Sequence, residues 1–108
     1  MDPLTNVLDA IAHPSRRAIL DRLARGPARV TEIAEPFDMS LNAVSKHLKI
    51  LEAAGLVSRE VQGREHYIEF RGEPLRLVSS WVHYHEKFWT QNLDRFEQHF
   101  KDKRKRKP

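Results

Sequence analysis

The sequence contains no cysteine. This absence excludes disulfide bonds, thiol nucleophiles and thiolate metal ligands. No apolar run approaches the roughly 20 residues that a helix needs to span a bilayer, so no membrane partner is expected. The first residues, Met1-Asp2-Pro3-Leu4-Thr5-Asn6, lack both the basic start and the apolar stretch of an export signal. We therefore expect a cytoplasmic protein.

The chain also has little excess charge outside its last residues. Its formal net charge is +4, but residues 101–107 carry six positive charges and one negative charge, which leaves −1 for residues 1–100. A chain of 108 residues, 40% of them hydrophobic, suits one domain with one modest core. We expect this domain to span residues 1–100. The basic segment 101–108 is expected to be a disordered tail, which either only solvates the end of the chain or adds contacts to phosphates.

Capping residues and apolar spacing predict two helices at the start of the chain. Asp2 is a good helix cap and Pro3 suits the first helical position, so a first helix is expected from here to about residue 12. Pro14 restarts the chain as a second helix, which Gly26 and Pro27 stop.

Two further helices are expected before residue 56. Thr31 is expected to cap a short third helix that Pro36 interrupts or ends. Ser40 caps the fourth helix, and Gly55 follows it as a left-handed C-cap. The inward stripe of this fourth helix falls at i, i+4 and i+7, and comprises Val44, Leu48 and Leu51.

After Gly55 the apolar period changes from helical to two. Residues 56–61 and 66–70 alternate, and Gln62-Gly63-Arg64-Glu65 separates them, which predicts a β-hairpin with a glycine-bearing, basic tip. A long helix is expected from Leu75 to Phe100, with aromatic residues on more than one face. Exposed aromatic stripes of this kind usually mark a surface for a partner.

The order of elements predicts the fold class. Four helices, a hairpin and a last helix make a mainly α fold with a β-hairpin wing, the winged helix-turn-helix pattern. A helix that enters the major groove needs a polar, small and basic outer face. The fourth helix meets this demand opposite its apolar stripe with Asn42, Ser45, Lys46 and Lys49, while Glu52 is its only acid.

Each of these signals also has an ordinary structural reading. A polar stripe on an amphipathic helix can be a solvated face, and Ser40 can act as a cap alone or also receive a phosphate. His47 borders the apolar stripe, so it either packs and hydrogen-bonds within the fold or contacts DNA. Arg64 is either a solvated turn residue or a wing contact to the minor groove or flanking phosphates.

Several segments share one specific pattern. The longest runs from Ser40 to Val57 as Ser-x-x-x-Val-Ser-x-His-Leu-x-x-Leu-x-x-x-Gly-Leu-Val, and residues 13–20, 30–34 and 63–64 add to it. This pattern resembles that of the ArsR/SmtB repressor family. The resemblance covers nearly the whole chain except the tail. It implies a homodimer, recognition helices in successive major grooves of a palindromic operator, and repression of its own operon that an unknown effector relieves. The two half-sites should lie about one helical turn apart.

The resemblance also implies roles for individual residues. Asn42 stands where family members often have proline, and it is expected to add a base or phosphate contact. The set expected to bind double-stranded DNA is Ser40, Asn42, Ala43, Ser45, Lys46, His47 and Lys49, with Arg64 in the wing. The dimer interface is expected to be built from the first and last helices, with Leu4, Leu8, Ile11, Trp81, His85, Phe88, Trp89 and Phe96.

The resemblance is weakest where metal-responsive members bind their effector. Their Cys-x-Cys motif is absent here, because residues 29–33 read Arg-Val-Thr-Glu-Ile. A second family site follows the pattern Asp-x-His-x10-His-x2-His, and this chain has His83, His85, Phe96 and His99 at those places. Three of the four positions could ligate zinc or nickel across a dimer with help from Glu86 or Glu97. Phe96 breaks the pattern, so we expect no metal site and no cofactor.

Residues 84–89 resemble the Tyr-x-x-Phe-Trp motif of a subgroup that lacks metal sites. An enzyme is disfavoured, because no Ser/His/Asp order, glycine-rich phosphate loop or His-Glu-x-x-His motif is present. A protein-interaction module on the same winged fold remains the alternative, since the fold alone does not determine function.

Overall fold

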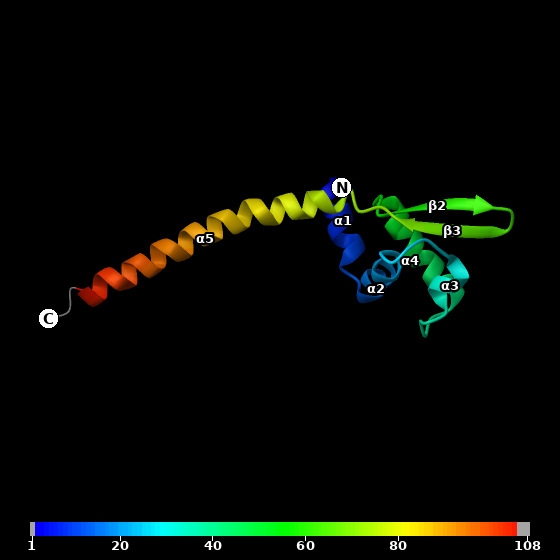
Figure 1. The fold of residues 1–108 in the computed structure, drawn as a ribbon, viewed down its shortest axis with the longest axis horizontal. Coiled ribbons are helices and arrows are strands. Elements are labelled where there is room, and N and C mark those ends of the chain that lie inside the picture. Colours follow the sequence, from blue (N-terminus) through cyan, green and yellow to red (C-terminus); the bar gives the residue numbers. More distant parts are fainter. Residues whose placement is uncertain (1, 106–108) are drawn as a thin grey trace. The chain divides into compact units, whose positions relative to one another are not determined.

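The computed structural model describes residues 2–105, with side chains as far as Lys101. The chain divides into two compact units, residues 1–78 and residues 79–108, which are described separately here. Figure 1 shows the elements along the chain. They are α1 (Pro3–Ile11), α2 (Pro14–Leu23), β1 (Ala28–Arg29), α3 (Val30–Ala34), α4 (Leu41–Ala53), β2 (Val57–Gln62), β3 (Glu65–Phe70) and α5 (Leu75–Lys105).

The first two helices begin where the sequence predicts. The Asp2 carboxylate accepts a hydrogen bond from the backbone N–H of Thr5 at 2.9 Å, which satisfies one of the free donors at the start of α1. His13 caps α2 in the same way, because its Nδ1 accepts from the backbone N–H of Ser15 at 3.1 Å. Helix α2 ends at Leu23, three residues before the predicted stop at Gly26.

The predicted start of the third helix is wrong by two residues. Helix α3 begins at Val30 with Arg29 as its N-cap, so Thr31 lies inside the helix. The reason is Glu32, whose carboxylate accepts the backbone N–H of Arg29 at 3.0 Å and so closes the first turn from within. Helix α3 ends at Ala34. Glu35 still has helical backbone, and Pro36 has no N–H with which to continue the helical hydrogen bonds.

Helix α4 has the two caps that the sequence predicts. Ser40 Oγ accepts the backbone N–H of Ala43 at 3.1 Å. At the other end Gly55 has a φ of +76°, and its N–H donates to the carbonyl of Glu52 at 2.9 Å. The N–H of Leu56 reaches the carbonyl of Leu51 at 3.0 Å, which completes a Schellman motif.

The predicted hairpin is confirmed, and a third strand joins it. Strands β2 and β3 pair antiparallel through a two-residue loop, in which Gly63 has a φ of +64° and Arg64 does not have a positive φ. This is the pattern of a type II′ turn, which matches the twist of a hairpin. Strand β1 pairs with Ile68 and Tyr67 of β3. It was not predicted, because two residues are too short to show a period.

The core of residues 1–78 gathers one face of each element. Val44, Leu48 and Leu51, the predicted inner stripe of α4, are fully buried. The other buried core residues are Val7, Ala10, Ile19, Leu20, Leu23, Ala28, Ile33, Leu56, Val57 and Ile68. Helix α4 therefore packs its apolar side inward and leaves its other side to solvent.

Helix α5 is 31 residues long, or about 46 Å. It continues through Lys105, five residues into the segment predicted as a tail. Lysine and arginine are good helix formers, and cations are favoured at a helix C-terminus. Residues 106–108 lie outside the described residues, so the predicted division at residue 100 stays a prediction. None of the described helices combines the length and the apolar character needed to cross a membrane.

Candidate nucleic-acid interface

The outer face of α4 carries the polar residues that the sequence singles out. Asn42, Lys46 and Lys49 are all exposed, on the side opposite the buried stripe. Among the described residues neither lysine forms an ion pair, so both ammonium groups are available to an external anion. Ser45 is half-buried on the flank of the same face.

Two predicted contact residues take part in the cap of α4. The hydroxyl of Ser40 and the backbone N–H of Ala43 are hydrogen-bonded to each other. Ser40 is exposed and Ala43 is half-buried. The N-capping role predicted for Ser40 is therefore confirmed, and its contact with a phosphate stays a prediction.

The structure places His47 against α2. Its ring lies 4.8 Å from that of His13, and its Nδ1 lies 3.4 Å from Nη1 of Arg16. Burial lowers the pKa of His47 below the ordinary value of 6.5, and the charges of His13 and Arg16 lower it further. The neutral form is therefore favoured, and the contacts agree with a structural role for this side chain.

Arg16 and Arg17 join α2 to the end of α1, a contact that the sequence analysis missed. Arg16 Nε donates to the carbonyl of Ala10 at 2.6 Å and its Nη2 donates to the carbonyl of Asp9 at 2.9 Å. Arg17 Nη1 donates to the carbonyl of Ile11 at 2.7 Å. These carbonyls are the unsatisfied, partly negative end of α1, so the two guanidinium groups stabilise the corner between the helices.

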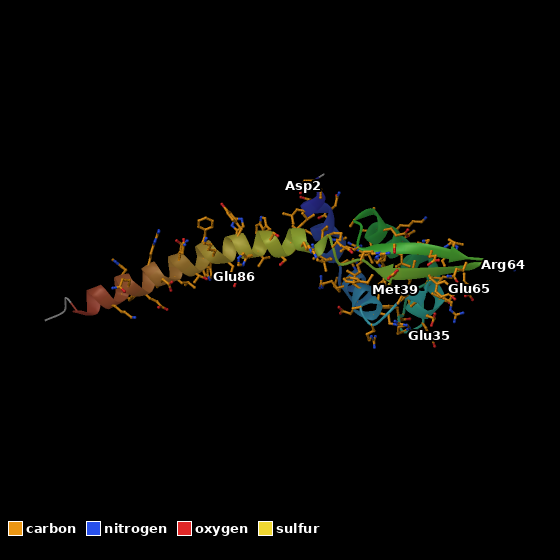
Figure 2. All side chains as sticks on the ribbon, turned by 45° about the horizontal axis from the view of Figure 1, so that its top comes forward. Asp2, Glu35, Met39, Arg64, Glu65 and Glu86 are labelled. Carbon is orange, nitrogen blue, oxygen red and sulfur yellow. The ribbon has the colours of Figure 1, made fainter. Side chains whose placement is uncertain are left out.

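Arg64 lies at the free end of the hairpin, as Figure 2 shows. It borders a cleft of about 360 Å³ between the start of α4 and the hairpin. Leu41, the first residue of α4, also lines this cleft and is 50% exposed. The sequence analysis passed over Leu41 because its helical position lies near the apolar stripe. From the hairpin Arg59 and His66 line the cleft, and from α4 Ser45 does.

The two faces of the hairpin differ in charge. Side chains alternate along a strand, so the register places Val57, Arg59 and Val61 of β2 on the inner face with His66, Ile68 and Phe70 of β3. This face carries no acid. The outer face carries Glu60, Glu65 and Glu69, among Ser58, Gln62 and Tyr67.

Glu52 has a partner in the hairpin. Its carboxylate lies 2.7 Å from Nη2 of Arg59, so its negative charge is compensated within the fold. The one acid of α4 therefore does not oppose a negatively charged ligand on the outer face.

A second charged network joins α3 to the hairpin. Arg29 donates to Glu32 at 2.9 Å and to Glu65 at 3.0 Å, and the Tyr67 hydroxyl donates to Glu65 at 2.8 Å. The bonds from Tyr67 and Arg29 lower the pKa of Glu65, and the bonds from Arg29 lower the pKa of Glu32. Both carboxylates therefore stay charged, and they connect the tip of the hairpin to the start of α3.

The residues predicted for a dimer interface fall into two groups. In α1 Leu8 is 41% exposed, whereas Leu4 and Ile11 are half-buried and Ile11 packs against the core. In α5 every residue from 79 to 101 is exposed. One apolar stripe of α5 recurs at helical spacing and comprises Val82, Trp89, Leu93, Phe96 and Phe100, and a second comprises Leu77, Trp81, Tyr84 and Phe88.

The candidate metal residues lie far apart on one helix. His85 and His99 are 14 residues apart, which is about 21 Å along α5. Within the described residues no three potential ligands come together. The ring of His85 lies 4.4 Å from that of Trp81. These distances lie within one chain, whereas the metal site of the resemblance would be shared between two copies.

The subgroup motif needs a correction in spacing. Three residues separate Tyr84 from Phe88, one more than in Tyr-x-x-Phe-Trp. The rings of Tyr84 and Phe88 lie 5.0 Å apart, edge to face, as neighbours one helical turn apart do. Membership of the subgroup stays a prediction.

Comparison with known proteins agrees with this geometry. A family model described as a helix-turn-helix domain matches residues 11–60. The chain is 35% identical over 79 residues to the transcriptional repressor SdpR of Bacillus subtilis (strain 168), covering 73% of this chain and 88% of that protein.

Two solved structures are similar in fold and in sequence. One is the crystal structure of an ArsR family transcriptional regulator, RHA00566, with a TM-score of 0.78 and 40% identity, covering 82% of this chain and 91% of that one. The other is the homodimeric winged helix-turn-helix DNA-binding domain Mb0332 of Mycobacterium bovis, with a TM-score of 0.64 and 31% identity, covering 81% and 82%. With its fold, its helix-turn-helix segment and these relatives, the chain belongs to the ArsR family of winged helix-turn-helix transcriptional regulators.

Proposed function

We propose that this protein binds double-stranded DNA as a homodimer, with α4 in the major groove and the hairpin against the flanking backbone. The observation that carries the proposal is the outer face of α4, which exposes Asn42, Lys46 and Lys49 and has its one acid neutralised by Arg59. A major groove admits a helix of this kind. Lysines without an internal partner are suited to phosphates.

Different residues of α4 contact different parts of the DNA. Lys46 and Lys49 contact phosphates or guanine edges, and Asn42 offers an amide that matches adenine. Ser45 offers a hydroxyl from the flank. Leu41 adds an apolar side chain at the helix start, where contact with a thymine methyl group favours A·T pairs.

The charge difference between the two faces of the hairpin orients it on DNA. Its inner face and tip present Arg59, Arg64 and His66 on the side of the cleft and α4. On the outer face Arg29 and Arg71 pair with Glu65 and Glu69, and Glu65 also lines the cleft, so Glu60 is the acid that repels phosphates most and favours turning this face away from the duplex. Arg64 at the tip then reaches the minor groove or the phosphates beside it.

A homodimer would cover the apolar stripes of α5. Thirteen large hydrophobic residues of the described chain are exposed, and nine of them belong to α5, from Leu77 to Phe100. Contiguous exposure of this kind favours a partner surface. The relative from Mycobacterium bovis is described as homodimeric. A two-fold dimer places two copies of α4 about one turn of DNA apart and so selects a palindromic operator.

The regulatory role follows the relatives. SdpR is named a repressor, which favours repression over activation for this chain, and its own operon is the natural target. Relatives named as regulators favour a cytoplasmic DNA-binding protein over an enzyme. Release by an effector is part of the proposal. The effector does not bind through cysteine ligands, because the chain has no cysteine.

The test is selection of DNA from a random pool by the full-length chain, followed by fluorescence anisotropy with the selected duplex and a scrambled duplex. The expected result is a palindrome preferred by about 10³-fold or more, with affinity that falls steeply as salt rises. Light scattering should show a dimer. Equal weak binding to both duplexes would contradict the proposal and favour a protein-interaction role.

A further inference from the structure

Three polar side chains connect α4 to both strands of the hairpin. Glu52 of α4 accepts two hydrogen bonds on Oε1, from Arg59 Nε at 3.2 Å and from Arg59 Nη2 at 2.7 Å. The remaining arm of the same guanidinium, Nη1, lies 3.0 Å from Nδ1 of His66 on β3. We call Glu52, Arg59 and His66 the relay.

The chemistry of arginine determines which ring nitrogen of His66 accepts in this contact. A guanidinium has only N–H donors, no acceptor, and does not lose its charge in proteins. His66 Nδ1 must therefore be the acceptor, with its lone pair directed at Arg59. A neutral imidazole with a bare Nδ1 carries its proton on Nε2. The relay thus presents an N–H donor at the outer edge of the His66 ring.

That donor lies where a ligand of α4 would meet the hairpin. His66 is exposed, on the inner face of the hairpin opposite Val61, and it lines the cleft with Ser45 and Arg64. Among residues 2–101 the one side-chain hydrogen bond of His66 is that of Nδ1 with Arg59, and Nε2 makes none. Phosphate oxygens and base edges of DNA supply acceptors.

The relay also adds a second connection to the end of the hairpin, which Arg29 holds through Glu65. Strand β1 pairs with β3 only at Tyr67 and Ile68, and the hairpin beyond them is two-stranded. Two strands alone are marginally stable. Arg59 and Glu52 keep only 24% and 31% of their side chains exposed, so their ion pair is shielded from solvent more than the other three ion pairs of the described chain.

We propose that His66 is a DNA-contacting hydrogen-bond donor, and that Glu52 and Arg59 are positioning residues that hold it and the hairpin in register with α4. This inference rests on the proposed function. Each of the three nitrogens of Arg59 bonds to Glu52 or His66, so these contacts determine the orientation of the guanidinium, and Arg59 in turn positions His66 and the hairpin.

The first test separates contact from position with two substitutions of the exposed His66. In His66→Gln the side-chain amide can place a donor near the position of Nε2, whereas in His66→Asn an amide oxygen replaces Nδ1 and the outer donor is lost. Anisotropy with the selected operator should show His66→Gln within about threefold of wild type and His66→Asn weaker by roughly tenfold. Equal affinities for all three proteins, or a weaker His66→Gln than His66→Asn, would overturn the contact.

The second test addresses the relay. Arg59→Met should weaken operator binding, and the double variant Arg59→Met/His66→Asn should lose little more than the weaker of the two single variants, because both act through one contact. Hydrogen exchange of the backbone amides at 61–66 should be faster in Arg59→Met. The matched control is Arg71→Met, which removes an arginine that pairs with Glu69 on the hairpin instead of with α4, and should leave affinity unchanged.

Different results would contradict the proposed DNA-binding function and the proposed relay. If wild type shows no preference for any operator, the proposed function is wrong. If wild type binds its operator and the losses in Arg59→Met and His66→Asn are fully additive, the function stands and the relay is wrong. The His66 pair needs no result from Arg59, so an unfolded Arg59 variant does not remove the test.

Discussion

Removing the two free lysines of α4 is the most direct perturbation of the interface. Lys46 and Lys49 are exposed, lie on the outer face of the helix and have no ion-pair partner within the described residues. The double variant Lys46→Gln/Lys49→Gln keeps two side chains that can donate hydrogen bonds but removes both charges. Because neither lysine contributes to the core, the unfolding temperature should change little.

The magnitude follows from counterion release. Each lysine that neutralises one phosphate contributes about 0.9 to the slope of log affinity against log salt, so the four lysines of a dimer contribute about 3.6. Between 50 and 200 mM salt this is about 2.2 decades. Wild type should therefore lose roughly 150-fold more affinity over that range than the double variant.

The assay is fluorescence anisotropy with the operator at several salt concentrations, with circular dichroism to confirm folding. The matched control is Lys87→Gln/Arg95→Gln, which removes two exposed cations of α5 outside the basic segment 101–108. An unchanged slope in the α4 variant would refute the assignment of these lysines to phosphates. An equal fall of slope in the α5 control would show that the attraction is general and not specific to α4.

Three further predictions concern recognition, stability and pH. Each thymine of the operator is replaced by uracil, one position at a time. At one position per half-site the replacement should lower the affinity of wild type about fourfold and leave the affinity of Leu41→Ala unchanged. The same sensitivity at every position in both proteins would contradict the methyl contact. Leu48→Ala should lower the free energy of unfolding by about 2–5 kcal/mol in urea titrations, because Leu48 is fully buried. The pKa of His47 is lowered by burial, then by His13 and Arg16, so the unfolded chain binds a proton first as pH falls. The free energy of unfolding should be constant above about pH 6.5 and should fall below it, and the fall should be smaller in His47→Gln. An identical pH profile in that variant would exclude His47 as the cause of the fall.

Local chemistry made much of the fold predictable. Ser40 and Gly55 mark the ends of α4 because a hydroxyl cap and a left-handed glycine act on their own few neighbours. The hairpin was visible from the change of period and from Gly63. The start of α3 was missed by two residues because Thr31 is a better cap by residue type, whereas Glu32 accepts the N–H of Arg29 from inside the helix.

Contacts between distant elements were not predictable from the sequence. Glu52 looked like an unfavourable charge on a DNA-binding helix until Arg59 was placed beside it. His47 looked suited to either role, and only the packing of α2 against α4 shows its ring beside that of His13. Exposure of Leu41 depends on where the hairpin leaves an open cleft. Sequence patterns report the neighbours along one helix, while these features depend on a second element.

The corner between α1 and α2 has a mechanical consequence. Three carbonyls of α1 are bonded to Arg16 and Arg17 of α2, and Arg16 also reaches His47 of α4. These contacts connect α1, α2 and α4 at one corner, so the three helices should move together as a rigid body. A small rotation of α1 would swing the far end of α4 through the same angle, with no helix bent or melted. A signal that alters only the angle between two copies could then change the spacing of their recognition helices and so decide whether both half-sites are reached.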